Sequence, residues 1–317
     1  MVKTAVLMAT YNGQGFIHDQ LDSIRNQTLR PDYVLMRDDG STDDTVKVVE
    51  DYIKEHRLDG WSITSNDKNL GWRLNFRQLL IDVLAYEVDY VFFSDQDDVW
   101  LPEKLSVSLE AAKHKASDVP LLVYTDLKVV NQELNILQDS MIRAQSHHAN
   151  TTLLPELTEN TVTGGTMMIN HALAEKWFTP NDILMHDWFL ALLAASLGEI
   201  IYLDLPTQLY RQHDNNVLGA RTMDKRFKIL REGPKSIFTR YWKLIHDSQK
   251  QASLIVDKYG DIMTANDLEL IKCFIKIDKQ PFMTRLRWLW KYGYSKNQFK
   301  HQVVFKWLIA TNYYNKR

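Results

Sequence analysis

An acidic motif, Ser94-Asp95-Gln96-Asp97-Asp98, directly follows the apolar run Tyr90-Val91-Phe92-Phe93. Three carboxylates within four positions repel one another, and they are costly to desolvate unless a cation neutralises them. Such oxygen ligands select Mg²⁺ or Mn²⁺, which also coordinate the oxygens of a diphosphate. A solvated acidic turn, or a helix N-cap before Leu101-Pro102-Glu103, is the alternative interpretation. The position after an apolar run, which a second acidic motif shares, favours the cation site.

The second motif is Asp38-Asp39-Gly40-Ser41-Thr42-Asp43-Asp44-Thr45. Gly40 permits a tight turn, and Ser41 or Thr42 can cap a following helix whose N-terminus favours anions. One aspartate remains to accept a hydrogen bond from a base imide N–H or a ribose hydroxyl. An ordinary capped turn explains Ser41–Asp44 but explains the two preceding aspartates poorly.

Alternating strands and helices are predicted to position these motifs. Apolar runs predict strands, and the segments between them have helical patterns. The strands are expected at Lys3–Ala9, Tyr33–Arg37, Trp61–Thr64, Tyr90–Ser94 and Leu121–Thr125, and the helices at Gly15–Gln27, Asp43–Glu55, Trp72–Tyr86 and Glu103–Lys115. This alternation predicts an α/β, doubly wound sheet in which ligands bind beyond the carboxyl ends of the strands. Tyr11-Asn12-Gly13 and both acidic motifs follow strands, as this rule requires.

The rest of the chain has a different character. An apolar run at Thr166–Ile169, a helix at His186–Leu197 and a strand at Glu199–Leu203 are expected, and only helical patterns follow Gly219. Residues 221–317 carry 21 Lys and Arg against 8 Asp and Glu, whereas the first 220 residues carry 38 − 21 = 17 against 40 − 8 = 32. The acidic part suits bound cations and the basic, aromatic part suits an anionic surface. One cysteine, Cys273, fits a reducing cytoplasm, and the sequence has no apolar stretch of membrane-spanning length.

Four motifs in register resemble the inverting family-2 glycosyltransferases. They are Ala9-Thr10-Tyr11-Asn12-Gly13, Asp38-Asp39-Gly40-Ser41-Thr42-Asp43, Asn69-Leu70-Gly71 and Ser94-Asp95-Gln96-Asp97-Asp98. The resemblance covers residues 3 to about 215 and implies a GT-A fold, with a Rossmann-like mixed sheet and a helical C-terminal extension. It divides the chain into a catalytic domain at 1–220, with a nucleotide-sugar half (1–130) and an acceptor half (131–220), and a helical region at 221–317. The Asp-Gln-Asp-Asp-Val-Trp form is similar to that of bacterial rhamnosyltransferases of surface polysaccharides, of streptococcal rhamnan type.

The resemblance also implies roles for individual residues. Thr10, Tyr11 and Asn12 would border the nucleotide, Asp39 or Asp38 would hold the base, and Asn69 and Gly71 would line the pocket. Gln96 would belong to the donor site, Asp95 would approach the ribose or sugar, Asp97 would ligate Mn²⁺ or Mg²⁺, and Asp98 would support the sugar or a metal-bound water.

The family's acidic general base lies at a helix start roughly ninety residues after the metal motif, and Asp187 in Met185-His186-Asp187-Trp188 is the candidate here. Many relatives have Glu-Asp where this chain has His186-Asp187. Helix N-capping is the alternative role for Asp187. Gly164, Gly165 and Trp188 would border the acceptor, although a plain turn is an alternative for the glycines.

The motif Tyr210-Arg211-Gln212-His213-Asp214-Asn215-Asn216 resembles the family's closing basic loop. Arg211 would neutralise diphosphate and His213 would ligate the metal or contact phosphate, whereas an ordinary surface loop is the alternative.

The partners expected are a nucleotide sugar, dTDP-rhamnose by resemblance, and a lipid-linked glycan acceptor. An anionic membrane surface is expected against the basic tail (Lys225, Arg226, Lys228, Arg231, and later Arg285, Arg287 and Lys291 among Trp288, Trp290 and Tyr292). The tail could instead form a helical bundle core, promote solubility or contact another copy in a homo-oligomer, and no nucleic-acid motif accompanies it. A glycoside hydrolase, a metal-dependent nucleotidyltransferase, a transferase of another nucleotide sugar and a non-catalytic sensor are the competing functions.

Overall fold

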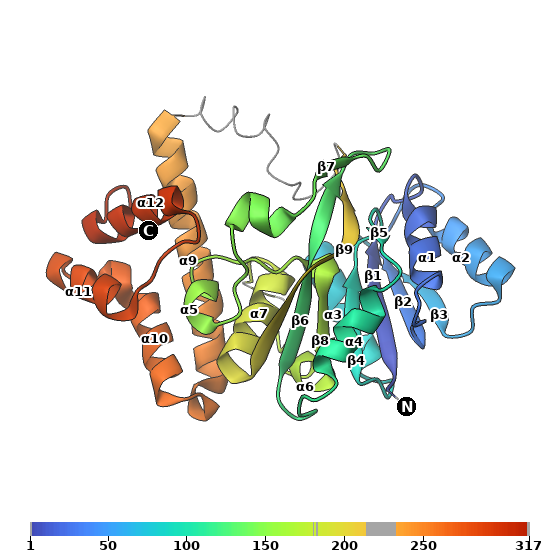
Figure 1. Cartoon of the computed structure of the whole chain (residues 1–317), viewed down its shortest axis with the longest axis horizontal. Coiled ribbons are helices and arrows are strands. Elements are labelled where there is room, and N and C mark those ends of the chain that lie inside the picture. Colours follow the sequence, from blue (N-terminus) through green and yellow to red (C-terminus); the bar gives the residue numbers. More distant parts are fainter. Residues whose placement is uncertain (1, 180, 182, 214–232, 316–317) are drawn as a thin grey trace.

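The computed structural model describes residues 2–179, 181, 183–213 and 233–315. Its centre is a mixed sheet of order β3-β2-β1-β4-β8-β6-β9-β5, with β7 paired to β6 (Figure 1). The strands are β1 (Thr4–Thr10), β2 (Tyr33–Asp38), β3 (Trp61–Ser65), β4 (Tyr90–Ser94), β5 (Val99–Trp100), β6 (Leu121–Val130), β7 (Ile136–Gln138), β8 (Met167–Asn170) and β9 (Glu199–Arg211). All five strands predicted in the first 130 residues are present, within a few residues of their expected ends.

Helices connect the strands and then continue alone beyond β9. They are α1 (Ile17–Arg25), α2 (Thr45–His56), α3 (Trp72–Val83), α4 (Lys104–Ala112), α5 (Leu153–Glu156), α6 (His171–Ala174), α7 (His186–Leu197), α9 (Gly233–Tyr259), α10 (Ala265–Lys276), α11 (Phe282–Tyr292) and α12 (Phe299–Thr311). Helix α7 has the predicted bounds. Gly260 follows α9, Pro281 precedes α11, and Gly293 ends α11 in the left-handed region at φ 75°. The positions of these residues agree with the tendency of proline and glycine to interrupt helices.

Strands β1, β2, β3 and β4 run parallel to one another, as the helical crossovers require. Strand β8 then pairs antiparallel with both β4 and β6, which makes the sheet mixed. The strand expected at Glu199–Leu203 continues to Arg211, because it pairs with β6 along its length and then with β5. This extension brings Arg211 to the acidic motif after β4.

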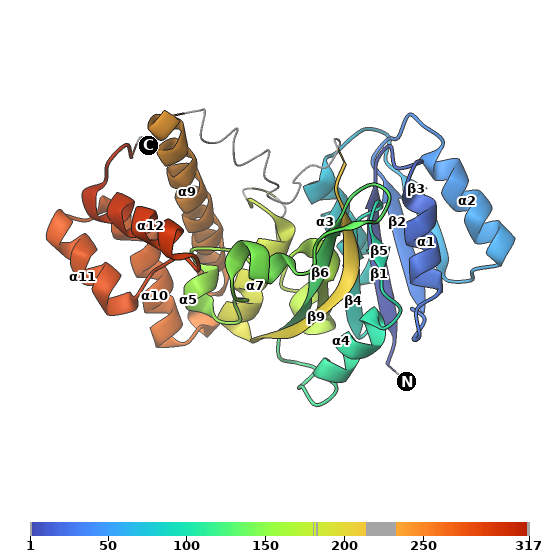
Figure 2. The ribbon, with the colours of Figure 1, turned by 45° about the horizontal axis from the view of Figure 1, so that its top comes forward.

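Both faces of the sheet are covered. One face packs Val6 and Met8 of β1 against α1, α2 and α4. The other face packs Ala5 and Leu7 against α3 and α7, and the same hydrophobic core continues to Trp242 of α9. The C-terminal helices therefore share a core with α7. They stand at the opposite end of the molecule from α1 and α2 (Figures 1 and 2).

Within the described ranges, no helix is long and apolar enough to cross a membrane. The basic residues Lys225, Arg226, Lys228 and Arg231 lie outside the described residues, as do Asp214, Asn215 and Asn216 of the closing loop.

Candidate active site

The predicted motifs meet at one edge of the sheet. Strand β1 ends at Thr10, which pairs with Asp38 at the end of β2, and Met8 pairs with Ser94 at the end of β4. Because these strands are parallel, the loops that follow them leave the sheet on the same side. The structure thus brings together the three segments that the sequence placed at strand ends.

The two aspartates after β2 have different hydrogen-bond partners. Asp38 is buried, and its carboxylate accepts four hydrogen bonds, from the Thr10 and Ser41 hydroxyls and from the Gly40 and Ser41 amides. Asp39 accepts three, from the Asn66 side chain at 2.9 Å and from the Leu70 and Gly71 amides at 2.8 Å. A carboxylate has about four acceptor positions, so Asp39 retains one while those of Asp38 are filled.

Asp39 also explains why the third motif lies beside the second. Its bonds to Leu70 and Gly71 hold Asn69-Leu70-Gly71 against the end of β2, and the Asn69 side chain accepts a further bond from the Gly71 amide at 3.1 Å. Gly71 has φ 81°, which favours glycine, and helix α3 begins at the next residue. One buried carboxylate therefore orders the whole loop.

The loop after β1 is held from both sides. The Gln96 side-chain carbonyl accepts the Tyr11 N–H and its amide donates to the Tyr11 carbonyl, both at 2.9 Å. On the other side, the Asn12 side chain accepts the Thr42 N–H at 2.8 Å. A Cβ on Gly13 would lie 2.2 Å from Gln96 Oε1, so a larger residue there would displace the Gln96 side chain from Tyr11. The Tyr11 side chain remains exposed at this edge.

The three carboxylates after β4 are not equivalent. Asp98 is fully buried and accepts hydrogen bonds from Gln208 Nε2 at 2.9 Å and from the Arg211 amide at 3.0 Å. Burial, reinforced by Asp97 and Asp95, raises its pKa well above the usual range. Burial and then Asp97 raise the pKa of Asp95 to about 7, against the opposing effect of Lys104. Burial and mutual repulsion thus disfavour the ionised forms of these carboxyl groups unless a cation is bound, as expected of a cation site.

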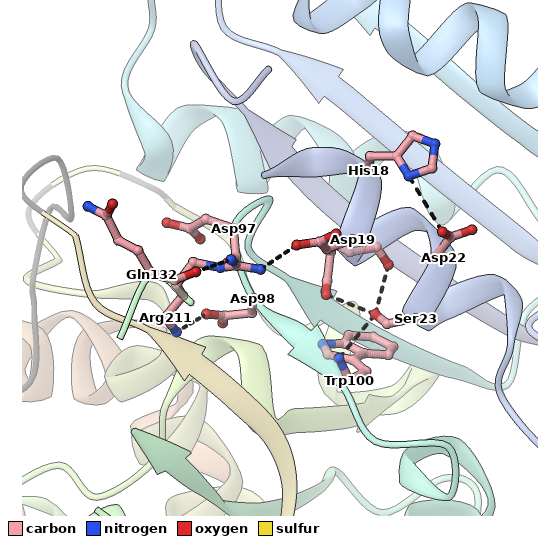
Figure 3. Close-up of polar contacts among 10 residues, drawn as sticks. His18, Asp19, Asp22, Ser23, Asp97, Asp98, Trp100, Gln132 and Arg211 are labelled. Carbon is pink, nitrogen blue, oxygen red and sulfur yellow. Dashed lines mark hydrogen bonds and ion pairs between the residues drawn. The ribbon is translucent and has the colours of Figure 1, made fainter. Parts of the chain in front are cut away.

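Arg211 ties the acidic loop to helix α1 (Figure 3). Its guanidinium donates to the Asp97 carbonyl at 2.9 Å, to the Gln132 carbonyl at 2.6 Å and to the Asp19 carboxylate at 2.7 Å. The side chain is buried and lies over the Phe16 ring. In these contacts the Arg211 guanidinium is hydrogen-bonded to acceptors of the protein itself. Its contact with a diphosphate stays a prediction.

A buried lysine, which the sequence analysis did not single out, underlies the acidic loop. Lys104 has no exposed surface, lies 4.2 Å from the Trp100 ring centroid, and donates to the Gly165 carbonyl and to Gln208 Oε1. Burial lowers its pKa to about 7, although Asp98 and Asp95 oppose the shift. A sequence signal exists, because Lys104 begins α4, where the helix dipole disfavours a cation. A compensating carboxylate nearby is the physical explanation.

Asp97 and His213 suit a divalent cation. His213 Nε2 lies 2.7 Å from Asp97 Oδ2, and its ring stacks on Phe16 at a centroid distance of 4.8 Å. No group of three His, Cys, Asp or Glu side chains converges as a complete metal site within the described ranges. One carboxylate and one imidazole match a cation such as Mn²⁺ or Mg²⁺ whose other ligands come from diphosphate and water. The crowded charge of Asp95 and Asp97 supports the same fit.

Asp187, the candidate general base, lies in the first turn of α7 and is almost completely buried. Its carboxylate accepts hydrogen bonds from the Gly164 amide at 3.2 Å and from Asn160 Nδ2 at 3.3 Å. Burial raises its pKa to about 7, with a contribution from the charge of Asp95. Gly164, which donates to Asp187, adjoins Gly165, whose carbonyl accepts a hydrogen bond from Lys104 beneath the acidic loop. A pKa close to neutral is what proton transfer at neutral pH requires.

His186 differs from its neighbour in the sequence. Its ring stacks on Phe76 at 4.5 Å and lies near Phe93, Trp72 and Trp177. Burial lowers its pKa to about 3, so the imidazole is neutral at physiological pH. Its ring nitrogens have no hydrogen-bond partner among the described residues. His186 therefore packs the start of α7 in an aromatic setting.

The glycine pair packs closely against this region. A Cβ on Gly164 would lie 2.8 Å from His186 Nε2, and a Cβ on Gly165 would lie 2.9 Å from Gln208 Nε2. Both positions therefore need glycine for close approach. Trp188 is buried, and its indole N–H donates to the Glu156 carbonyl at 2.7 Å. The acceptor-binding roles of Gly164, Gly165 and Trp188 stay predictions.

A separate cavity of about 610 Å³, lined in part by Lys3, Asp89 and His171, lies at the amino ends of β1 and β4. It contains none of the motif residues. The chemistry is therefore assigned to the carboxyl edge of the sheet.

The mixed sheet, with its acidic loops at the carboxyl edge and its C-terminal helices, is that of a GT-A glycosyltransferase. It is similar to TarS 1–349 of Staphylococcus aureus, solved with UDP-GlcNAc (TM-score 0.56, 18% identity, 98% of this chain and 91% of that chain). It is also similar to the mannosyltransferase PcManGT from Pyrobaculum calidifontis, solved with GDP-Man and Mn²⁺ (TM-score 0.50, 14% identity, 98% and 88% covered). These two likenesses establish the fold.

The sequence establishes the family. Residues 5–178, more than half of the chain, match glycosyl transferase family 2. The chain is 31% identical over 224 residues to the dTDP-rhamnosyl transferase RfbG of Shigella flexneri, which covers 67% of this chain and 74% of that protein. The chain belongs to glycosyl transferase family 2 and is a hexosyltransferase, in a family where dependence on a divalent metal is typical.

Proposed function

We propose that the chain transfers L-rhamnose from dTDP-β-L-rhamnose to a hydroxyl of a lipid-linked glycan during synthesis of a bacterial surface polysaccharide. The likeness to a dTDP-rhamnosyl transferase over two thirds of the chain supports the donor. The observation that carries the reaction type is Asp187, a buried carboxylate bonded to Gly164, whose neighbour Gly165 is hydrogen-bonded to Lys104 beneath the acidic loop. The enzyme would act in the cytoplasm, at the inner face of the plasma membrane where lipid-linked acceptors are available.

The donor site is assigned to the edge formed by β1, β2 and β4. Asp39, which retains an acceptor position, would bind the imide N–H of the base, whereas Asp38 holds the turn. Thr10, Tyr11, Asn12 and the Asn69–Gly71 loop would border the nucleotide. Asp97 and His213 would hold Mn²⁺ or Mg²⁺, which when bound would neutralise charge on the departing diphosphate.

The reaction is a single displacement. Asp187 takes the proton of the acceptor hydroxyl while that oxygen forms a bond to the anomeric carbon. The bond from that carbon to the diphosphate oxygen breaks, and dTDP leaves with the electron pair. Attack from the opposite face inverts the anomeric centre, so a β-linked donor yields an α linkage. The Gly164 amide and Asn160 orient the carboxylate for this step.

Replacing Asp187 with Asn tests the assignment, because the two side chains have the same shape and only the carboxylate can accept the proton. Transfer should fall about 10²–10⁴-fold. Binding of dTDP with Mn²⁺, measured by thermal shift, should stay close to that of the wild type. Asp204→Asn is the matched control, since Asp204 is an exposed carboxylate paired with Arg143 on the surface. Full transfer activity in Asp187→Asn would overturn the role of Asp187 as base.

The donor is tested separately. A thermal-shift panel of nucleotide sugars with Mn²⁺ or Mg²⁺ should show the largest stabilisation with dTDP-rhamnose. A larger shift with another nucleotide sugar would replace rhamnose while leaving the transferase mechanism intact. Release of pyrophosphate during turnover would identify a nucleotidyltransferase instead.

A further inference from the structure

Helix α11 presents apolar side chains to solvent along one side. Phe282, Leu286 and Trp290 recur every four residues, which places them in one stripe, and Trp290 is 88% exposed. The inner side of the helix carries Arg285 and Leu289, which are buried. The stripe is therefore separate from the surface with which α11 joins the protein core.

Helix α12 repeats the pattern. Phe299, Val303 and Trp307 are exposed at the same four-residue spacing, and Phe299 is 80% exposed. Its buried side is formed by Phe305, Leu308 and Ile309. We call the six exposed residues of the two helices the α11–α12 apolar surface (Phe282, Leu286, Trp290, Phe299, Val303 and Trp307). Helices α11 and α12 contact each other, so both stripes belong to one part of the molecule, and several exposed aromatic and aliphatic side chains there mark an interaction surface.

The segment that carries this surface contains charged residues of one sign. Residues 282–315 contain six Lys and Arg and no Asp or Glu. Two of the six are used internally: Arg285 donates to the Gln280 and Ala310 carbonyls, and Lys296 donates to the Thr158 carbonyl. Of the other four, three are exposed and Lys306 is half-buried. The four are Arg287 and Lys291 of α11 and Lys300 and Lys306 of α12.

Lys291 is the one of these four with a recorded carboxylate partner, Glu269 at 2.8 Å, within the part of the chain that the structure describes. Fully exposed ion pairs of this kind contribute little to stability. The positive charge beside the two stripes is thus largely uncompensated by acidic residues of these helices. A partner that covers the surface must therefore accept both apolar side chains and several cations.

We propose that the α11–α12 apolar surface docks this enzyme on an anionic lipid bilayer. Exposed Trp and Phe side chains insert at headgroup depth, while the flanking Lys and Arg side chains contact lipid phosphates. A second copy of the chain fits less well, because a two-fold contact would bring these cations against one another. This surface lies at the end of the molecule away from α1 and α2, so docking leaves the donor edge of the sheet accessible (Figure 2).

Flotation with vesicles tests the proposal on the full chain. The protein should float with vesicles that contain phosphatidylglycerol in phosphatidylcholine and should stay behind with phosphatidylcholine alone. Trp290→Ser and Phe299→Ser together should lower vesicle binding about tenfold or more, since each removes an exposed aromatic side chain that the bilayer would bury. Leu137→Ser on β7, which replaces another exposed apolar residue, is the matched control and should not change binding.

The charge contribution is tested in the same assay. Arg287→Gln with Lys300→Gln should lower binding to anionic vesicles about 25-fold, because each cation contributes about fivefold. Raising the salt concentration should have a similar effect.

Three results would overturn the proposal: no flotation of the wild type, equal flotation with neutral lipid, or a dimer in sedimentation that Trp290→Ser dissociates. None of them bears on sugar transfer, because donor hydrolysis and dTDP binding in solution do not involve these helices. A failed flotation with intact donor hydrolysis therefore leaves the proposed function standing.

Discussion

Replacing Lys104 with Met is the sharpest test of how the acidic loop is stabilised. The substitution keeps the length and volume of the side chain but removes the buried ammonium group. The Gly165 carbonyl and Gln208 Oε1 then lose their donor, in a region from which water is excluded. Asp98, which receives a hydrogen bond from Gln208, loses both a nearby cation and an ordered partner.

The expected loss of stability follows from these contacts. Each buried acceptor left unsatisfied costs about 1–3 kcal/mol, so two cost about 2–6 kcal/mol. A central value of about 4 kcal/mol corresponds to a fall in Tm of about 8 °C, at about 2 °C per kcal/mol for a chain of this size.

Thermal denaturation followed by circular dichroism at neutral pH measures this loss. Lys113→Met is the matched control, because Lys113 ends the same helix on the surface and pairs with Glu110 there. Its Tm should change by no more than about 1 °C. A Lys104→Met protein that melts within about 2 °C of the wild type would show that Lys104 does not hold the acidic loop and the turn at Gly165 together.

Three other predictions concern the reaction itself. Burial raises the pKa of Asp187 to about 7, so the carboxylate that accepts the proton is lost as pH falls through that value. Transfer should therefore be about tenfold slower near pH 6 than near pH 8. A rate that does not change between these pH values would exclude a base with this pKa. Replacing His186 with Met should leave this pH profile unchanged, since the imidazole is already neutral, whereas a displaced profile would give His186 a part in proton transfer. Replacing His213 with Ala should raise the Mn²⁺ concentration needed for half-maximal activity about tenfold or more, and an unchanged requirement would remove His213 from the metal site.

The sequence predicted much of this protein because its local signals agree. Apolar runs of strand length alternate with helical patterns up to Leu121, and β1, β2, β3, β4 and the start of β6 were found where they were expected. Parallel pairing then required that the polar segments after β1, β2 and β4 share an edge. In the C-terminal region, α9 ends before Gly260, and α11 begins after Pro281 and ends before Gly293. The backbone preferences of these residues act within a few residues along the chain. The prediction of the metal motif and of Asp187 as the base relied on this order of strands and helices along the chain.

Tertiary structure decided what each polar side chain does. Asp38 and Asp39 are adjacent and chemically identical, yet Asp39 accepts hydrogen bonds from the Leu70 and Gly71 amides and from the Asn66 side chain, whereas Asp38 accepts bonds from within its own turn. His186 and Asp187 are also adjacent, but the Asp187 carboxylate accepts hydrogen bonds whereas the His186 ring nitrogens have no partner among the described residues.

Contacts between segments far apart in the sequence also determine how the acidic loop is held. Arg211 pairs with Asp19, and Lys104 reaches Gly165 and Gln208, so these cations hold the acidic loop to α1 and to the glycine turn. Hydrogen bonding and pKa depend on which groups surround a side chain after burial, and no local pattern in the chain records that. The sequence alone therefore determined which chemical groups are available at the edge of the sheet, and folding determined the hydrogen-bond partners and the burial of each.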